Sequence, residues 1–167
     1  MPELHIRPTT PDDIPEILAF IRELADYERE PASAVATYDD LLRDGFGPVK
    51  RFHCLVAEYD GAAAGFALYF YNYSTWRGHA GIYLEDLFVR PAYRGKGIGK
   101  ALLSAVAGIA VAAGCPRLEW AVLNWNQLAI DFYNSIGALA MSEWTTMRLS
   151  GDALRKLGPA MAGSKNA

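Results

Sequence analysis

The stretch of this chain best suited to bind an anion is residues 94–100, which lies between an apolar strand pattern and a helical pattern. It contains Gly95, Gly97 and Gly99 together with three basic residues. Glycine has no Cβ atom, so the backbone there can approach a ligand closely. The N–H groups at a helix start have no intrahelical acceptor, and the helix dipole favours an anion beside them. Residues 94–100 are therefore predicted to hold a phosphate group.

Two common phosphate-binding motifs do not fit this loop. A P-loop needs Ser or Thr after Gly-Lys to bind magnesium, and here Ala101 follows Gly99-Lys100. The dinucleotide pattern G-x-G-x-x-G fails because Lys100 stands where its last glycine is required. Glycines in a strand-to-helix turn are also often only structural, so the flanking residues must decide between the two interpretations.

With its flanks the loop reads Arg-x-x-Gly-x-Gly from Arg94 to Gly99, and it resembles the acetyl-CoA pyrophosphate motif of the GNAT N-acetyltransferase superfamily. More narrowly, the chain resembles the diamine and thialysine acetyltransferases, the branch of the superfamily that contains enzymes like spermidine/spermine acetyltransferase. The resemblance runs from Ile6 to Leu157. It is carried by residues 22–28, 44–47, 52–58, 83–86, 125–126 and 132–133.

The resemblance implies an α/β fold with a mixed, mostly antiparallel central sheet, splayed central strands and flanking helices. We expect one acetyltransferase domain over residues 1–157 and a disordered tail over 158–167. Residue patterns predict strands at 4–7, 52–58, 63–71, 82–89, 118–123 and 139–149. They predict helices from Thr10 to about Glu28, from Thr37 to a stop at Gly45, at 98–113 and at 127–136.

Composition limits the partners that this chain can have. A length of 167 residues with 51% hydrophobic residues suits one soluble domain. The net charge of −3 gives no general attraction to nucleic acid or anionic lipid, so we expect neither as a partner. No basic-then-apolar start or long apolar run indicates a leader or membrane span, which favours the cytoplasm. Cys54 and Cys115 lack metal-ligand spacing; we expect no metal and two buried free thiols.

Acetyl transfer to an amine requires a proton acceptor. An alkyl ammonium has a pKa of about 10.4, so very little free amine exists near neutral pH, and a carboxylate can remove the proton directly or through water. Glu85 and Asp86 lie on the strand that leads to the loop. Side chains alternate across a strand, so only one should face the cleft. The resemblance implies Glu85, and Asp86 is expected to be a structural or exposed acid.

The thiolate that leaves needs a hydrogen-bond donor or acid, which a phenol can supply. The resemblance implies that Tyr133 is this proton donor, although a tyrosine beside Phe132 could equally be a packing residue. It also implies that Asn126 contacts the pantetheine arm, while a cap of the helix at 127–136 explains Asn126 equally well.

The resemblance implies the remaining cofactor contacts. The backbone of Leu87, Phe88 and Val89 is expected to pair with the pantetheine amides. The pyrophosphate is expected to lie against Arg94, Gly95, Lys96, Gly97, Ile98, Gly99 and Lys100.

The resemblance also implies an amine pocket that is lined by Tyr27, Glu28, Glu85, Glu119, Trp120 and Ala121. Glu28 could instead be a solvated acid, and Trp120 a core residue. Ser74 stands where polyamine acetyltransferases typically have an acid, which favours thialysine or a related lysine-like amine over long polycations.

We therefore predict an acetyl-CoA-dependent N-acetyltransferase that transfers acetyl directly to a small primary amine, with thialysine favoured. A diamine or polyamine acetyltransferase is the enzymatic alternative, and a non-catalytic acetyl-CoA-binding regulator is a remote one. The resemblance implies a homodimer.

Overall fold

The computed structural model describes residues 1–158. The chain divides into two compact units, residues 1–123 and residues 124–167. Apart from residue 158, the tail predicted at 158–167 lies outside the described residues.

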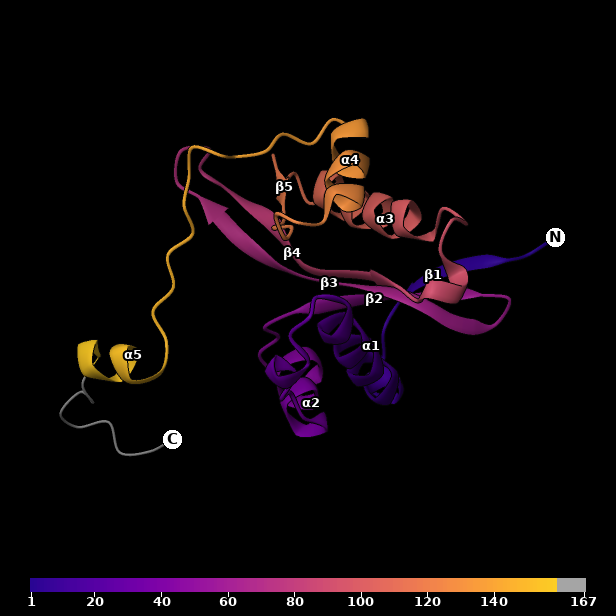
Figure 1. Cartoon of the computed structure of the whole chain (residues 1–167), viewed down its shortest axis with the longest axis horizontal. Helices are drawn as coiled ribbons and strands as arrows, with labels where there is room; N and C mark the ends of the chain where they lie inside the picture. The colour runs from indigo at the N-terminus through magenta and orange to yellow at the C-terminus, as the bar shows by residue number, and fades with distance from the viewer. Residues whose placement is uncertain (159–167) are drawn as a thin grey trace. The chain divides into compact units, whose positions relative to one another are not determined.

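The first unit is built on a five-stranded sheet in the order β1-β2-β3-β4-β5 (Figure 1). Neighbouring strands from β1 to β4 are antiparallel, and β5 is parallel to β4. This mostly antiparallel sheet confirms the predicted fold class. The strands are β1 (Leu4–Pro8), β2 (His53–Tyr59), β3 (Ala62–Ser74), β4 (His79–Val89) and β5 (Leu118–Glu119).

Helices cover both faces of the sheet. Figure 1 shows α1 (Ile14–Tyr27) and α2 (Tyr38–Phe46) on one face and α3 (Ile98–Ala112) on the other. Short 3-10 helices are η1 (Pro11–Asp13), η2 (Pro31–Ser33) and η3 (Pro91–Tyr93). The core beneath α1 joins apolar side chains of the helix to the sheet, with Phe20 stacked on Phe66 at 5.1 Å between ring centroids and edge-on to Phe88.

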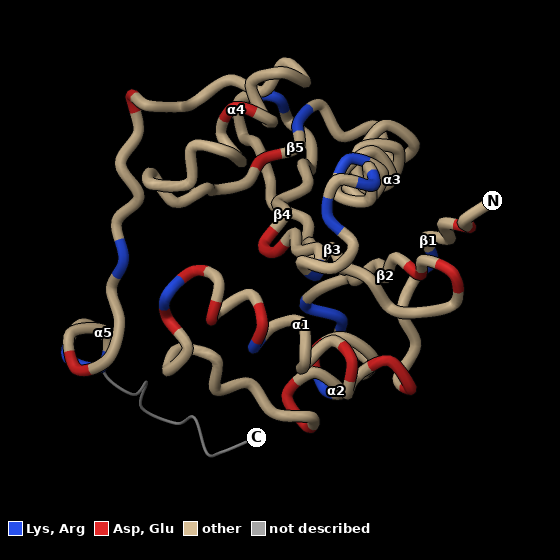
Figure 2. Tube along the Cα trace, turned by 45° about the vertical axis from the view of Figure 1, so that its right-hand side comes forward, with Lys and Arg blue, Asp and Glu red and all other residues tan. Residues whose placement is uncertain are grey.

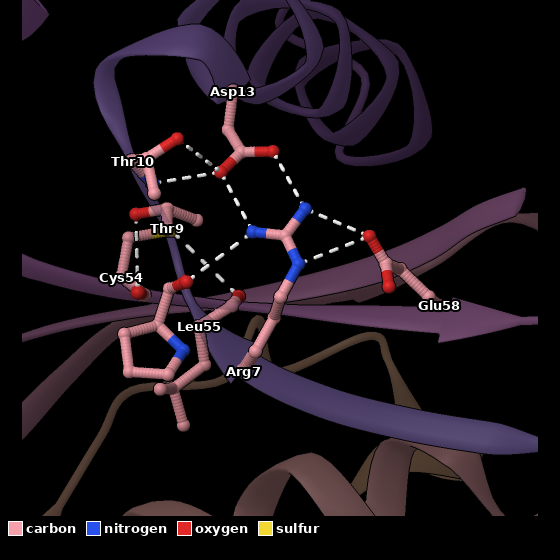
Figure 3. Close-up of polar contacts among 8 residues, drawn as sticks. Arg7, Thr9, Thr10, Asp13, Cys54, Leu55 and Glu58 are labelled. Atoms are coloured by element: carbon pink, nitrogen blue, oxygen red, sulfur yellow. Dashed lines mark hydrogen bonds and ion pairs between the residues drawn. The ribbon is translucent and has the colours of Figure 1, made fainter. Parts of the chain in front are cut away.

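An ion-pair network ties the start of α1 to the sheet (Figure 3). The Arg7 guanidinium on β1 donates to both carboxylate oxygens of Asp13, at 2.8 and 3.0 Å, and to Glu58 on β2. These bonds keep the pKa of Asp13 below its usual value. Asp13 also accepts from the backbone N–H of Thr10. The predicted helix start is formed as the 3-10 turn η1, and α1 itself begins at Ile14.

A second clamp joins the end of β4 to the middle of α1. The Arg90 guanidinium donates to both carboxylate oxygens of Glu23 and to the carbonyl of Ala63, and it lies 4.5 Å from the centre of the Phe20 ring. Planar hydrogen-bonded arginine pairs of this kind fix orientation as well as distance. The C-terminal half of α1 is therefore held in register with β4.

Several expectations from the sequence are wrong. Gly45 does not stop the second helix; it is buried within α2, and a Cβ atom there would collide with the Phe52 ring. The helix ends at Phe46 because Gly47 adopts an extended conformation. Cys54 is buried as expected, whereas Cys115 is only half-buried.

The predicted closing strand over residues 139–149 is not formed within the described residues. Its large apolar side chains are exposed, with Leu139 at 84% and Met147 at 86%. An extended segment becomes a strand only when a neighbour accepts and donates its backbone hydrogen bonds. Between residues 124 and 158 the chain instead forms the helices α4 (Gln127–Ser135) and α5 (Gly151–Leu157), and α5 was not predicted.

Within residues 1–158, no helix is long and apolar enough to cross a membrane. The same residues contain no group of three His, Cys, Asp or Glu side chains that could hold a metal ion.

Candidate active site

The predicted phosphate loop leads into α3 in the conformation that its glycines permit. Gly95 and Gly97 both have φ of +77°, in the left-handed region that side chains with a Cβ atom rarely adopt. Gly97 caps α3, and the first intrahelical bond runs from Ala101 N–H to the Gly97 carbonyl at 3.0 Å. Among residues 1–158, no side chain caps this helix start. The N–H groups of its first turn are therefore available to an anion.

Two basic side chains of the loop lie over aromatic rings. The Arg94 guanidinium carbon is 4.8 Å from the centre of the Tyr27 ring, and Lys96 Nζ is 5.1 Å from the centre of the Tyr59 ring. Figure 2 shows basic residues in the loop that leads into α3 and acidic residues on β4. The loop thus supplies positive charge a few residues beyond the acids of β4.

Beside the loop, the outer edge of β4 is largely unpaired. β5 pairs with β4 only at Ile82 and Tyr83, so the strand predicted at 118–123 ends four residues early. No other described strand of this unit pairs with that edge from Leu84 to Val89. This is the splayed arrangement that the resemblance implied. The backbone of residues 87–89 lies in this open stretch, as pairing with an extended ligand would require.

A β-bulge interrupts β4 at the proposed catalytic position. Leu68 on β3 is opposite Asp86 and Tyr69 is opposite Leu84, which leaves Glu85 as an extra residue. Beyond the bulge, Phe88 contacts Phe20 of α1. Because residues two apart share a face and a bulge adds one residue, Glu85 and Asp86 both lie on the face covered by α1.

Alternation therefore fails at this point, and the expectation that only one of the two acids faces the cleft is wrong. Asp86, expected to be a structural or exposed acid, is half-buried. Burial and the neighbouring charges of Glu85 and Glu28 raise the pKa of Asp86 to about 7. The sequence does carry one sign of the bulge. The apolar residues Ile82, Leu84, Leu87 and Val89 are spaced by two, three and two, and the step of three marks the change of phase.

Glu28, at the end of α1, completes what we call the acidic cluster: Glu28, Glu85 and Asp86. Burial and then the charge of Glu85 raise the pKa of Glu28. Tyr83 on the same strand also has a raised pKa, because of burial and then the charges of Glu85 and Glu119. Three carboxyl groups that repel one another are well suited to bind an ammonium group, since its positive charge relieves the repulsion.

The other predicted pocket residues lie at or just after β5. The Glu119 carboxylate pairs with the Arg117 guanidinium at 3.0 Å and accepts a long hydrogen bond from the Asn72 amide. Its charge is therefore already partnered. Trp120 is half-buried and Ala121 is exposed, and both follow β5 in irregular backbone.

Ser74 lies apart from the acidic cluster within one chain. It ends β3 opposite His79, six residues before Glu85 on β4, which corresponds to about 20 Å along a strand. Ser74 is 4% exposed, and its hydroxyl accepts from the Arg77 N–H at 3.2 Å. The hydroxyl thus stabilises the turn between β3 and β4.

The two remaining predicted site residues belong to the second unit. Asn126 caps α4, since its side-chain oxygen accepts from the Ala129 N–H at 3.3 Å. Tyr133 lies near the C-terminal end of α4, is half-buried, and its ring centre is 5.5 Å from that of Phe132. These contacts are consistent with a structural role for either residue, and equally with proton donation by Tyr133 and a pantetheine contact by Asn126.

The fold and this site define an N-acetyltransferase. The model of the Acetyltransferase (GNAT) family matches residues 16–138, and the chain belongs to this family. GNAT acetyltransferases use acetyl-CoA as the acetyl donor.

Relatives cover nearly the whole chain. A thialysine N-epsilon-acetyltransferase of Bos taurus is 42% identical over 91% of this chain and 95% of its own length. Spermidine/spermine N(1)-acetyltransferase-like protein 1 of Homo sapiens is 38% identical over 92% of this chain but only 24% of its own length. Among solved structures, an integron cassette protein from the mobile metagenome of V. cholerae is 29% identical with a TM-score of 0.79, covering 94% of this chain and 98% of its own.

Proposed function

We propose that this enzyme transfers acetyl from acetyl-CoA directly to the primary amine of a small molecule, and that thialysine or another lysine-like amino acid is its preferred substrate. The observation that carries the proposal is the order of features along and after β4. Glu85 and Asp86 come first, the unpaired edge at residues 87–89 follows, and the basic loop opens α3. The proposed ammonium site and the proposed phosphate site are thus joined by a short stretch of strand edge that no described strand of the first unit pairs with.

The proposed coenzyme contacts follow from this order. The backbone of Leu87, Phe88 and Val89 offers hydrogen bonds along an edge that no described strand of the first unit occupies. The pyrophosphate would accept hydrogen bonds from the first-turn N–H groups of α3 and from the charged loop side chains. The residues proposed for this role are Arg94, Gly95, Lys96, Gly97, Ile98, Gly99 and Lys100.

The acidic cluster would bind the ammonium and take its proton. Glu85 is the proposed acceptor, either directly or through a water molecule, because it is the more exposed of the two bulge carboxylates. Asp86 and Glu28 would increase the negative potential around it. Tyr27, next to Glu28 and 37% exposed, is proposed as part of the pocket wall.

The remaining site roles are proposed from the family resemblance. Tyr133 would protonate the leaving thiolate, and Asn126 would contact the pantetheine arm. Trp120 and Ala121 are proposed as pocket residues, and Glu119 as one whose charge is shared with Arg117. We also propose a homodimer in the cytoplasm. The family match crosses from the first unit into the second, which supports one functional domain over residues 1–157.

A diamine or polyamine acetyltransferase is the second candidate. The similarity to the human spermidine/spermine acetyltransferase-like protein favours it. So does the acidic cluster, because three carboxyl groups could hold more than one ammonium.

The test is release of free thiol from acetyl-CoA with thialysine, lysine, putrescine, spermidine and spermine at matched concentrations. Preference for thialysine is expected. Preference for spermidine would replace it with the polyamine assignment. If acetyl-CoA binds but no amine releases thiol, the proposed substrate class is wrong.

A further inference from the structure

The Arg94 side chain connects the loop to the amine side of the proposed site. Its Nε donates to the Val89 carbonyl at 2.9 Å, and this hydrogen bond holds the Nε end of the guanidinium beside the last residue of β4. The guanidinium carbon lies 4.8 Å from the centre of the Tyr27 ring and 5.7 Å from that of the Phe88 ring. Arg94 is thus held between a loop proposed to bind phosphate and the last residue of α1.

Tyr27 leads directly to the acidic cluster. It precedes Glu28 at the end of α1, and the pKa of Glu28 is raised by burial and then by the charge of Glu85 on β4. The Arg90 clamp ties α1 to the end of β4 through Glu23, one turn before Tyr27. A change in the position of the Tyr27 ring would therefore change the wall of the amine pocket.

The guanidinium has capacity to hold a second partner. The hydrogen bond to Val89 uses Nε, and the described residues provide no hydrogen bond to either terminal nitrogen. A planar guanidinium stacks through its face and donates through its edge, so one contact does not exclude the other. Arg94 can therefore bind a phosphate oxygen while it remains over Tyr27.

We propose that Arg94 is a positioning residue that couples the two ligand sites: a phosphate bound at the loop fixes its guanidinium against Tyr27, and this orders the amine pocket. The inference rests on the proposed function. Linkage is reciprocal, so the amine must strengthen coenzyme binding by the same factor. An exposed cation–π contact is worth enough to change affinity by about two- to fivefold.

The coupling is measured by isothermal titration of thialysine with and without saturating coenzyme A, which lacks the acetyl group and prevents turnover. We expect thialysine to bind the wild type about two- to fivefold more tightly with coenzyme A. Arg94→Lys keeps the charge but loses the flat face and the fork of donors. Arg94→Lys and Tyr27→Leu should each reduce the ratio to about one, and the double variant should reduce it no further.

Lys96→Gln is the matched control. It also removes a loop cation and a ring contact, but its ring is Tyr59 on β2 rather than Tyr27. We expect this variant to weaken coenzyme A binding while the coupling ratio stays at the wild-type value. Equal loss of coupling in Lys96→Gln and Arg94→Lys would overturn the specific role of Arg94.

A second measurement does not need the amine. In protein labelled with 3-fluorotyrosine, the ¹⁹F signal of Tyr27, assigned with Tyr27→Phe, should shift when coenzyme A binds, and the shift should be lost in Arg94→Lys. If coenzyme A binds by calorimetry and the Tyr27 signal does not move, the coupling is wrong while the coenzyme assignment survives. If coenzyme A does not bind, the proposed function and the coupling both fail. A Tyr27 shift without thialysine binding would support the coupling and reject only the proposed amine.

Discussion

Glu85 and Asp86 are consecutive residues whose side chains lie on the same face of β4. The bulge opposite Leu68 and Tyr69 is the cause, because it inserts Glu85 as an extra residue. Burial of the Asp86 carboxyl, and then the neighbouring charges of Glu85 and Glu28, raise its pKa to about 7. The raised pKa makes the stability of the protein depend on pH, and in the proposed site it would make amine binding depend on pH as well.

Asp86→Asn should stabilise the protein above pH 7. A carboxyl group whose pKa rises from 3.8 to about 7 on folding binds more protons in the native state between those values. Wild-type stability should therefore fall as the pH rises from about 4 to 7, and the asparagine variant should lack most of this slope. We expect a gain of about 2 kcal/mol at pH 8, measured by urea unfolding. Asp12→Asn, at an exposed carboxylate, is the control and should retain the wild-type slope.

Binding of thialysine near pH 7 should release protons. An ammonium beside Asp86 stabilises the ionised carboxylate, so the pKa of Asp86 must fall on binding. About half a proton should be released at pH 7, since the group is then half protonated before binding. Calorimetry in buffers with different ionisation enthalpies measures this number. The same release from Asp86→Asn would show that another group supplies the proton.

Glu85→Gln should move the pH–rate profile to more alkaline values. Without its proton acceptor the enzyme depends on amine that is already neutral, and that fraction rises about tenfold per pH unit below pH 10. The measurement is kcat/KM for the amine from pH 6 to 10. A profile with the wild-type shape would return Glu85 to a structural role.

Tyr133→Phe should lower kcat by about 100-fold or more while the affinity for acetyl-CoA changes little. The phenol is proposed to act on the leaving thiolate, which exists only as the reaction proceeds, so ground-state binding does not depend on it. Single-turnover rates and acetyl-CoA titrations separate the two effects. Parallel losses in both would indicate that the ring and hydroxyl of Tyr133 only support the structure.

Gly97→Ala and Gly108→Ala should have opposite effects on stability, although both lie in or next to α3. Gly97 has φ of +77°, so alanine there should cost about 1 kcal/mol and weaken coenzyme A binding. Gly108 lies in the helix interior with open space where a methyl group would point, so alanine should gain up to about 1 kcal/mol. Thermal unfolding measures both. A stable Gly97→Ala variant would mean that the loop does not need the left-handed conformation.

Local sequence was sufficient for the parts of this protein that depend on neighbours in the chain. The apolar spacing after Thr10-Pro11 predicts α1, and the glycine-rich segment at 94–100 predicts a turn that leads into α3. These features follow from backbone geometry and short-range hydrogen bonds, which a single segment contains.

Tertiary structure decided the features that depend on a partner strand or on close packing. In the sequence, Gly45 resembles a residue that ends a helix. In the structure it is a glycine inside α2 because the Phe52 ring occupies the space that a Cβ atom would need. β5 ends at Glu119, and residues 139–149 do not form a strand, because strand formation needs a neighbour that the local sequence does not specify. The role of Asp86 belongs here as well. Alternation along one strand predicts that the Asp86 carboxyl points away from that of Glu85. The pairing with β3 leaves Glu85 as an extra residue, and this bulge places both carboxyl groups on one face.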